Sequence, residues 1–257
     1  MTSHDFIAVF YSGVGGLSVL RQLRRLLPGE DYLYFGDCAN APYGSRSTEE
    51  VRALTMAAAE QIIGQNPVKA LVVACNTATS AAIRDLRKRY PALIVIGIEP
   101  ALKLAADTFP GGRIGVMATE VTLREEKFDT LMHRFNTGCS VVKIPAPGLV
   151  ELIEQGKADS QEAEALLNTI LSPHVGQLDA LVLGCTHYPF AANTLSRILG
   201  PEVALLDGGE GTARETKRRL ELSGLLRTRT EPGQVIFHNS AGDQRLNKFF
   251  LEVMHRE

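Results

Sequence analysis

The sequence predicts an α/β protein made of two similar halves, each with a parallel β-sheet and covering helices. Short apolar segments alternate with stretches whose apolar residues recur at helical spacing, and the alternation continues along the whole chain. Strands that are separated by helices pair in parallel, and the helices then cover both faces of the sheet. Two of the apolar segments are also followed by similar sequence, which indicates an internal duplication.

Nine short apolar segments are expected to form the strands. They are Phe6–Phe10, Tyr32–Phe35, Ala70–Ala74, Leu93–Ile96, Arg113–Met117, Ser140–Ile144, Ala180–Leu183, Val203–Leu206 and Gln234–Phe237. Helical periodicity between them is clear at Leu17–Leu27, Glu49–Ile63 and Ala81–Arg89. Sites in such sheets form in loops at the carboxyl ends of strands, so reactive side chains just after a strand are the candidates for chemistry.

The internal repeat centres on two cysteines. Leu71-Val-Val-Ala-Cys75-Asn-Thr77 and Leu181-Val-Leu-Gly-Cys185-Thr-His187 each contain an apolar run, a small residue, a cysteine and two polar residues. A weaker similarity joins Ile7–Ser12 to Ile114–Thr119. We therefore expect an N-terminal α/β domain at residues 1–98, completed by the C-terminal segment 207–257, and a second α/β domain at 99–206.

The composition is that of a soluble globular protein. Of the 257 residues, 45% are apolar and 22% charged, which argues against intrinsic disorder. The net charge of -2 shows no basic excess, so no nucleic-acid partner is expected. No apolar run could span a membrane, and Met1–Asp5 does not resemble a secretory signal. We expect a cytoplasmic protein with reduced cysteines.

Cys75 and Cys185 are the candidate reactive groups, because each follows a predicted strand in the same local sequence. If the two halves face each other, one thiol approaches a bound ligand from each side. That layout suits inversion of a carbon centre, in which a base removes a proton from one face and an acid delivers one to the other. A thiol, with a reference pKa of about 8.5, can take both roles. His187 would deprotonate Cys185 or pair with its thiolate.

The alternative for any single cysteine is a buried core position, because free cysteines are among the most buried residues. The matched sequences favour a reactive role for Cys75 and Cys185, whereas Cys38 and Cys139 lack a match and are expected to be structural. A zinc site at Cys185 and His187 is disfavoured, since no further ligands follow at the usual spacing, and no metal is expected.

A glycine-rich segment, Ser12-Gly-Val-Gly-Gly16, follows the first strand and opens a helix. Such turns present backbone N–H groups to anions, including carboxylates, although a tight turn without a ligand explains the glycines equally well. A dinucleotide fingerprint would need a further glycine at position 18, which is Ser18. Because Asp37 falls near the place of a ribose-binding acid, nucleotide binding stays open as a third interpretation.

Small polar groups follow several other predicted strands. Pro42-Tyr43-Gly44 is a stiff turn that offers a phenol and backbone donors. Together the polar groups suit a small zwitterionic ligand with carboxylates, although each one alone is typical of a cap or turn. The other members of the set are Asn76, Thr77, Thr119, Thr122 and Thr186.

Taken together, these motifs resemble those of the glutamate racemases, in both their order and their spacing over most of the chain. The matching segments are Ser12–Gly16, Pro42–Gly44, Ala74-Cys-Asn-Thr-Ala78 and Gly184-Cys-Thr-His-Tyr-Pro189, with Gly97–Pro100 and Leu149–Glu151 as further landmarks. The resemblance implies a cofactor-independent isomerase that interconverts L- and D-glutamate for peptidoglycan synthesis, and so serves cell wall biogenesis and cell shape. It also implies two α/β domains related by a pseudo-twofold axis, an active site in the cleft between them, and a homodimer.

The resemblance also implies roles for individual residues. Cys75 would take the α-proton from D-glutamate and Cys185 from L-glutamate, with His187 assisting Cys185 and Glu151 as a further acidic group. The substrate would be held by the residues that match the binding positions of the family: Tyr11, Ser12, Pro42, Tyr43, Gly44, Asn76, Thr77, Thr119, Thr122, Thr186 and His187.

One position departs from the family pattern. The family motif begins Asp-Ser-Gly, whereas this chain has Tyr11-Ser12-Gly13. In the family, that aspartate lies beside the thiol matching Cys75 and is thought to help with its proton. A tyrosine is larger and, with a reference pKa near 10, a poor base at pH 7. We therefore expect impaired or skewed catalysis, in which the proton-abstraction step of the D-to-L direction suffers while the overall equilibrium stays unchanged.

Two other functions remain open at this stage. The first is a two-cysteine racemase or isomerase of aspartate or another small dicarboxylate, because pocket shape sets the preferred chain length. The second is a non-catalytic homologue that binds a small acid or a protein partner, since Tyr11 replaces an acidic group.

Overall fold

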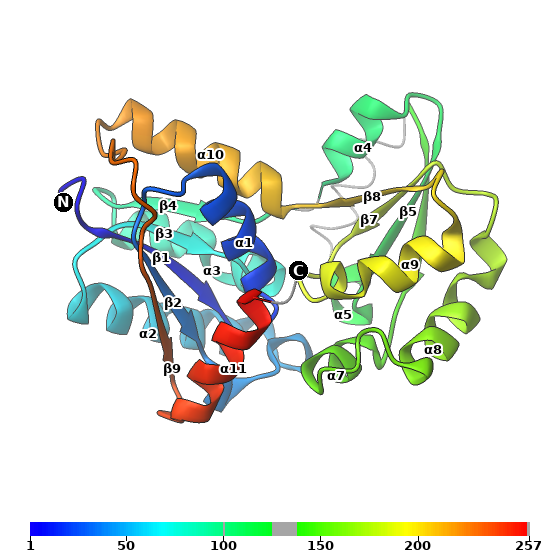
Figure 1. Cartoon of the computed structure of the whole chain (residues 1–257), viewed down its shortest axis with the longest axis horizontal. Coiled ribbons are helices and arrows are strands. Elements are labelled where there is room, and N and C mark those ends of the chain that lie inside the picture. The colour runs from blue at the N-terminus through cyan, green and yellow to red at the C-terminus, as the bar shows by residue number, and fades with distance from the viewer. Residues whose placement is uncertain (100, 125–137, 256–257) are drawn as a thin grey trace. The chain divides into compact units, whose positions relative to one another are not determined.

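The computed structural model describes residues 1–99, 101–124 and 138–255, and it divides into two compact units. Met1–Glu99 and Gly209–Glu257 form the first unit, and Pro100–Gly208 form the second. Each unit is an α/β structure with one fully parallel sheet, which confirms the predicted fold class (Figure 1). All nine expected strands are present, with bounds that differ from the expected ones by at most two residues at either end.

The first sheet is built around β1 and takes its edge strand β9 from the far end of the chain. Its strands, in spatial order, are β4 (Ile94–Gly97), β3 (Val68–Val73), β1 (Phe6–Tyr11), β2 (Tyr32–Gly36) and β9 (Val235–Asn239). β1 is almost wholly buried, as a central strand covered on both faces must be. The pairing of Leu33 with Ile236 and of Tyr34 with Phe237 shows how the C-terminal segment completes this sheet.

Helices cover both faces of the first sheet. α1 (Leu17–Leu26) packs against α10 (Gly209–Leu222), whereas α2 (Thr48–Gln65) packs against α3 (Asn76–Arg89) (Figure 1). The pairs lie on opposite faces, because right-handed crossovers that run in opposite directions across a sheet place their helices on opposite sides. The terminal helix α11 (Gln244–His255) packs against β9 and α1.

The helix bounds follow from local signals. α2 begins with a capping box, in which Ser47 and Glu50 satisfy each other's backbone N–H groups, and it buries one stripe that includes Val51, Ala58 and Ile62. α3 begins earlier than its apolar periodicity predicts, because the side chain of Cys75 caps it.

The second sheet repeats the order of four strands of the first sheet, without a counterpart of β9. In spatial order its strands are β6 (Ser140–Pro145), β5 (Arg113–Ala118), β7 (Ala180–Leu183) and β8 (Ala204–Asp207). β5, β6, β7 and β8 therefore take the places of β1, β2, β3 and β4. This agreement in topology extends the similarity in sequence that indicates a duplication, and it makes Cys75 and Cys185 equivalent, because they follow β3 and β7.

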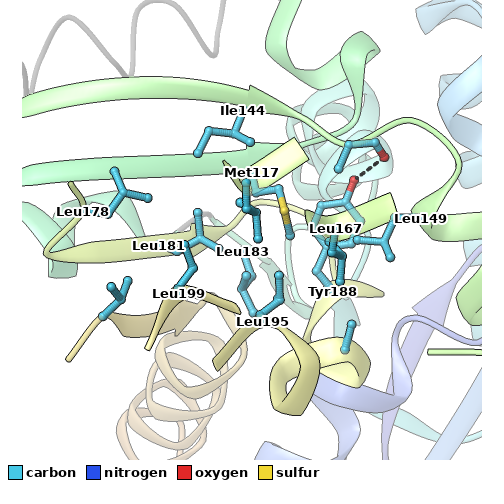
Figure 2. Packing of buried hydrophobic residues seen from close by; sticks show 14 of the residues in the cluster. Met117, Ile144, Leu149, Leu167, Leu178, Leu181, Leu183, Tyr188, Leu195 and Leu199 are labelled. Atoms are coloured by element: carbon cyan, nitrogen blue, oxygen red, sulfur yellow. Dashed lines mark hydrogen bonds between the residues drawn. The ribbon is translucent and has the colours of Figure 1, made fainter. Parts of the chain in front are cut away.

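Alternation along the strands of the second sheet creates two apolar layers. Met117, Leu181 and Leu183 point to one face, where Leu167 and Leu195 from the covering helices pack on them (Figure 2). The helices of this layer are α7 (Leu149–Glu154), α8 (Gln161–Leu171) and α9 (Ala192–Leu199). Val116 and Val182 point to the other face, against residues of α4 (Leu102–Thr108) and α5 (Glu120–Arg124).

Within the part of the chain that the structure describes, four short 3₁₀ segments lie in the loops: η1 (Cys38–Asn40), η2 (Tyr43–Ser45), η3 (Ser172–His174) and η4 (Tyr188–Ala191). Two of them, η1 and η4, lie close after the ends of β2 and β7, where functional loops are expected. None of the helices in the described ranges combines the length and the apolar composition that a membrane crossing needs.

A buried ion pair ties the C-terminal segment to the first sheet. Lys69, on β3, is fully buried, and its Nζ donates to the carboxylate of Glu30 and to the carbonyl oxygens of Ser3 (2.7 Å) and Leu225 (3.0 Å). The other oxygen of Glu30 accepts from the backbone N–H of Arg227 (2.9 Å). Because Leu225 and Arg227 lie between α10 and β9, this cluster fixes the segment that leads to the edge strand.

We expect Lys69→Met to lower the free energy of unfolding by about 3 to 5 kcal/mol, because it leaves the Glu30 carboxylate buried without its cation. Urea denaturation measures the change. The matched control is Arg214→Met, which breaks the exposed pair with Glu210 on α10 and should change stability by less than about 0.5 kcal/mol. Equal effects of the two substitutions would contradict this assignment.

Candidate active site

Cys75 lies where the first sheet meets the N-terminus of α3. It follows β3 and Ala74, its backbone is extended, and its Sγ accepts from the backbone N–H of Ala78 (3.5 Å). The side chain is 4% exposed. A helix N-terminus favours negative charge, so this position stabilises a thiolate electrostatically. The thiol is therefore placed to gain and lose a proton at the carboxyl edge of the sheet.

Tyr11 ends the neighbouring strand β1 and Ser12 follows it directly, and both are buried. The side chain of Tyr11 lies against Gly16, where a Cβ added to the glycine would come within 2.6 Å of the Tyr11 Cβ. Glycine at this position therefore makes room for Tyr11, a close approach that no other residue allows. The turn itself is held by Tyr34 on β2, whose hydroxyl donates to the carbonyl oxygen of Gly13 (2.6 Å).

The loop after β2 brings Tyr43 into the same unit. Its side chain is buried, its ring packs near Phe10 with centroids 6.2 Å apart, and its hydroxyl donates to the Asp37 carboxylate (2.6 Å). Burial, followed by the hydrogen bond to Asp37 and the charges of Asp37 and Cys75, raises the pKa of Tyr43 far above its usual range. Tyr43 is therefore a permanent proton donor to Asp37, and it feels the charge of Cys75.

Cys185 occupies the equivalent place in the second unit. It follows β7 and Gly184 and is partly exposed, and its Sγ lies 3.6 Å from Nδ1 of His187. The other ring nitrogen of His187, Nε2, lies 3.1 Å from Oε1 of Glu154, at the end of α7. Sulfur, imidazole and carboxylate thus form one hydrogen-bonded chain.

The hydrogen-bonded series of Cys185, His187 and Glu154 controls the charge of His187. Burial alone would disfavour the imidazolium, but the hydrogen bonds with Cys185 and Glu154 and their charges outweigh it and raise the pKa of His187 to about 9. At pH 7 the imidazole therefore carries a proton. Of the two roles that the sequence allows His187, the ion-pair partner of a Cys185 thiolate is the one that this charge favours.

Glu154 is a site residue that the sequence analysis missed. The resemblance points to Glu151, in the first turn of α7, whose charge acts on Tyr188; Glu151 and Glu154 are both exposed residues. Glu154 is three residues further along the same helix and is the carboxylate that meets His187. The signal that could have found it is the spacing, since residues three apart share a helix face. Glu151 stays a predicted site residue.

The remaining predicted residues fall at the same edges of the two sheets. In the first unit, Asn76 and Thr77 form the start of α3, and Pro42 and Gly44 flank Tyr43. In the second unit, Thr186 is buried beside Cys185, and the hydroxyls of Thr119 and Thr122 lie 2.9 Å apart after β5. Each unit thus carries one of the two matched cysteines and a set of small polar groups at the same edge of its sheet.

Two other sequence interpretations concern metal and nucleotide. Among residues 1–99, 101–124 and 138–255, no three His, Cys, Asp or Glu side chains gather as metal ligands. Asp37, the candidate ribose-binding acid, accepts from the side chains of Tyr43 and Asn40 instead. The pKa of the buried Cys139 thiol is raised by desolvation, as is typical of a structural cysteine.

With this geometry in place, comparison with known proteins defines the class. The family model for Asp/Glu/Hydantoin racemases matches residues 14–216, and the chain belongs to this family. Within it, a glutamate racemase of Clostridium novyi (strain NT) is 48% identical over 235 residues, which cover 91% of this chain and 90% of the relative.

Solved structures of glutamate racemases support the same family assignment. A glutamate racemase isoform from Bacillus anthracis matches with a TM-score of 0.87 and 32% identity, over 99% of this chain and 96% of its own. The glutamate racemase from Thermus thermophilus, in complex with beta-chloro-D-alanine, matches with a TM-score of 0.81 and 37% identity, over 100% of this chain and 95% of its own.

We expect His187 to titrate near pH 9 in the folded protein and Glu154→Gln to lower that midpoint by removing a negative charge. Because the folded pKa is raised above 6.5, the stabilisation from the imidazolium is complete below about pH 6.5 and is lost as the pH rises through about 9. NMR titration of the imidazole measures the midpoint. Glu151→Gln, on the same helix, is the matched control and should shift it less; a larger shift there would identify Glu151 as the partner.

Proposed function

We propose that this protein is a glutamate racemase that moves one proton between two thiols across the substrate. The observation that carries the proposal is the recurrence of one arrangement in both units: a buried parallel strand, a cysteine at its carboxyl end, and groups that stabilise negative charge on that cysteine. Family membership and the names of the relatives support glutamate as the substrate.

The two units would act as domains, with boundaries close to 98 and 207, related by a pseudo-twofold axis with the substrate in the cleft between them. The equal strand order of the two sheets supports this, because equivalent strand ends then carry equivalent groups. Cys75 and Cys185 would approach the α-carbon from opposite faces. Such an arrangement inverts the centre without requiring the substrate to turn over in the site.

For L-glutamate, the Cys185 thiolate takes the α-proton and becomes a thiol, leaving the electron pair on the α-carbon. The Cys75 thiol then donates its proton to the opposite face and becomes a thiolate. D-glutamate reacts in the reverse order. His187, protonated and held by Glu154, stabilises the Cys185 thiolate, and the N-terminus of α3 stabilises the Cys75 thiolate.

The polar groups at the two sheet edges would hold the ammonium and the two carboxylates of the substrate. They are Ser12, Pro42, Tyr43, Gly44, Asn76 and Thr77 in the first unit, and Thr119, Thr122, Thr186 and His187 in the second. No cofactor takes part, because both proton transfers use side chains of the chain itself. The product would serve peptidoglycan synthesis in the cytoplasm, and the enzyme would act as a homodimer.

We expect Cys75→Ser and Cys185→Ser each to lower racemisation by about 10²- to 10⁴-fold, because a general acid–base group typically contributes that much. Circular dichroism follows turnover, and exchange of the α-proton in D₂O, measured separately from each enantiomer, reports each face of the site. Cys38→Ser, at a cysteine outside the two repeats, is the matched control and should keep wild-type turnover.

Three results would favour an alternative. Near-wild-type turnover in either cysteine variant would refute the two-thiol mechanism. Faster turnover of aspartate than of glutamate by the wild-type protein would identify aspartate as the preferred substrate, and glutamate binding by calorimetry without deuterium entering the α-carbon would indicate a non-catalytic homologue.

We expect Tyr11→Asp to raise kcat/KM for D-glutamate by about tenfold, because it supplies a base beside Cys75 where a buried tyrosine now stands. The equilibrium between the enantiomers cannot change, so kcat/KM for L-glutamate must rise equally. Circular dichroism kinetics in both directions measure these values. An unchanged or lower kcat/KM would refute the idea that Tyr11 impairs the enzyme.

A further inference from the structure

Asp37 is a buried acid beside the proposed site that the mechanism above does not use. It follows β2 directly, it is 3% exposed, and its backbone N–H donates to the carbonyl oxygen of Tyr11 (2.8 Å). It therefore lies at the carboxyl edge of the first sheet, next to the strand that ends in Tyr11. A carboxylate in this position needs hydrogen-bond donors, because burying a charge without partners is costly.

Two side chains of the following loop supply those donors. The hydroxyl of Tyr43 donates at 2.6 Å, and the side-chain amide of Asn40 donates to both carboxylate oxygens at 2.9 and 3.2 Å. Hydrogen bonds to an ionised group are shorter and stronger than neutral ones. The buried carboxylate is thus the anchor to which the loop after β2 is attached.

Further bonds extend this anchor along the loop. The backbone N–H of Asn40 donates to the carbonyl oxygen of Asp37 (3.1 Å), and Nε of Arg46 donates to the carbonyl oxygen of Asn40 (2.9 Å). The backbone N–H of Arg46 donates to the carbonyl oxygen of Tyr43 (3.2 Å). The segment from Asp37 to Arg46 is therefore held by several hydrogen bonds within itself, and Gly44 lies between the residues that make them.

Gly44 is the part of this segment that has room for a ligand. A Cβ added there would meet no atom within 4 Å, and its φ is not in the left-handed region. Neither its own conformation nor its neighbours within the chain therefore require glycine. A glycine in such a place lets another molecule approach the backbone closely.

We propose that Asp37 is a positioning residue for substrate binding, which acts by holding Tyr43 and, through it, the backbone of Gly44. The inference rests on the proposed function, which places Tyr43 and Gly44 at the substrate. Both carboxylate oxygens of Asp37 are engaged by its own loop, so this acid acts through the loop and does not move the α-proton. Its loss should weaken binding of the substrate in the ground state and in the transition state alike, and so raise KM more than it lowers kcat.

The test is a double-mutant cycle of Asp37→Asn and Tyr43→Phe, with kcat and KM measured for both enantiomers. We expect each single substitution to raise KM by about tenfold, the size of a lost charge-assisted hydrogen bond, with kcat changed much less. The double substitution should be little worse than either single one, because both act on the same charge-assisted bond: Asp37→Asn removes the charge of its acceptor and Tyr43→Phe removes its donor. Tyr43→Phe removes one oxygen atom only, so it carries the test if Asp37→Asn does not fold.

The control is Tyr32→Phe, which removes a buried tyrosine hydroxyl that donates to the carbonyl oxygens of Leu23 and Leu27 in the same unit. It should lower Tm without changing KM. An unchanged KM in both test variants would overturn the proposal, as would a fall in kcat alone or fully additive effects. Absence of racemisation and of glutamate binding in the wild-type protein would instead refute the proposed function, on which the inference rests.

Discussion

Parallel strand pairing is the constraint on which the rest of this structure depends. All strands of a parallel sheet end at the same edge, so residues that are far apart in the chain meet there when each follows a strand. In the first unit this edge gathers Tyr11, Asp37 and Cys75 from the ends of three strands. In the second unit it gathers Thr119 and Cys185. One topology, used twice, thus supplies two similar edges.

The two cysteines have the same place in the fold but different surroundings. The sulfur of Cys75 accepts from a backbone N–H at the start of α3, and that of Cys185 lies against the His187 ring, whose pKa Cys185 and Glu154 together raise. A helix terminus provides a fixed partial charge, whereas an imidazole provides a charge that can titrate. In the proposed reaction, the two thiolates are therefore stabilised in different ways, although the two cysteines occupy equivalent places in the two sheets.

Buried charge also organises the first unit, both away from the proposed site and beside it. The Lys69–Glu30 pair fixes the segment before β9, and Asp37 fixes the loop after β2. Both carboxylates are almost completely buried, and each accepts from a segment outside the regular helices and strands: Glu30 from the backbone N–H of Arg227, and Asp37 from the side chains of Asn40 and Tyr43. Such anchors define the course of loops that apolar packing alone would leave loosely determined.

The sequence by itself determined the nine strands and the two matched cysteines, because apolar strand segments and local repeats can be recognised from consecutive residues. It pointed to Glu151 rather than Glu154 and left Asp37 with only a weak nucleotide role. Only the tertiary structure decided that His187 meets Glu154 and that Tyr43 meets Asp37. The reason is physical: which carboxylate reaches a buried partner depends on helix phase and loop course, and these are set by packing between segments distant in the chain.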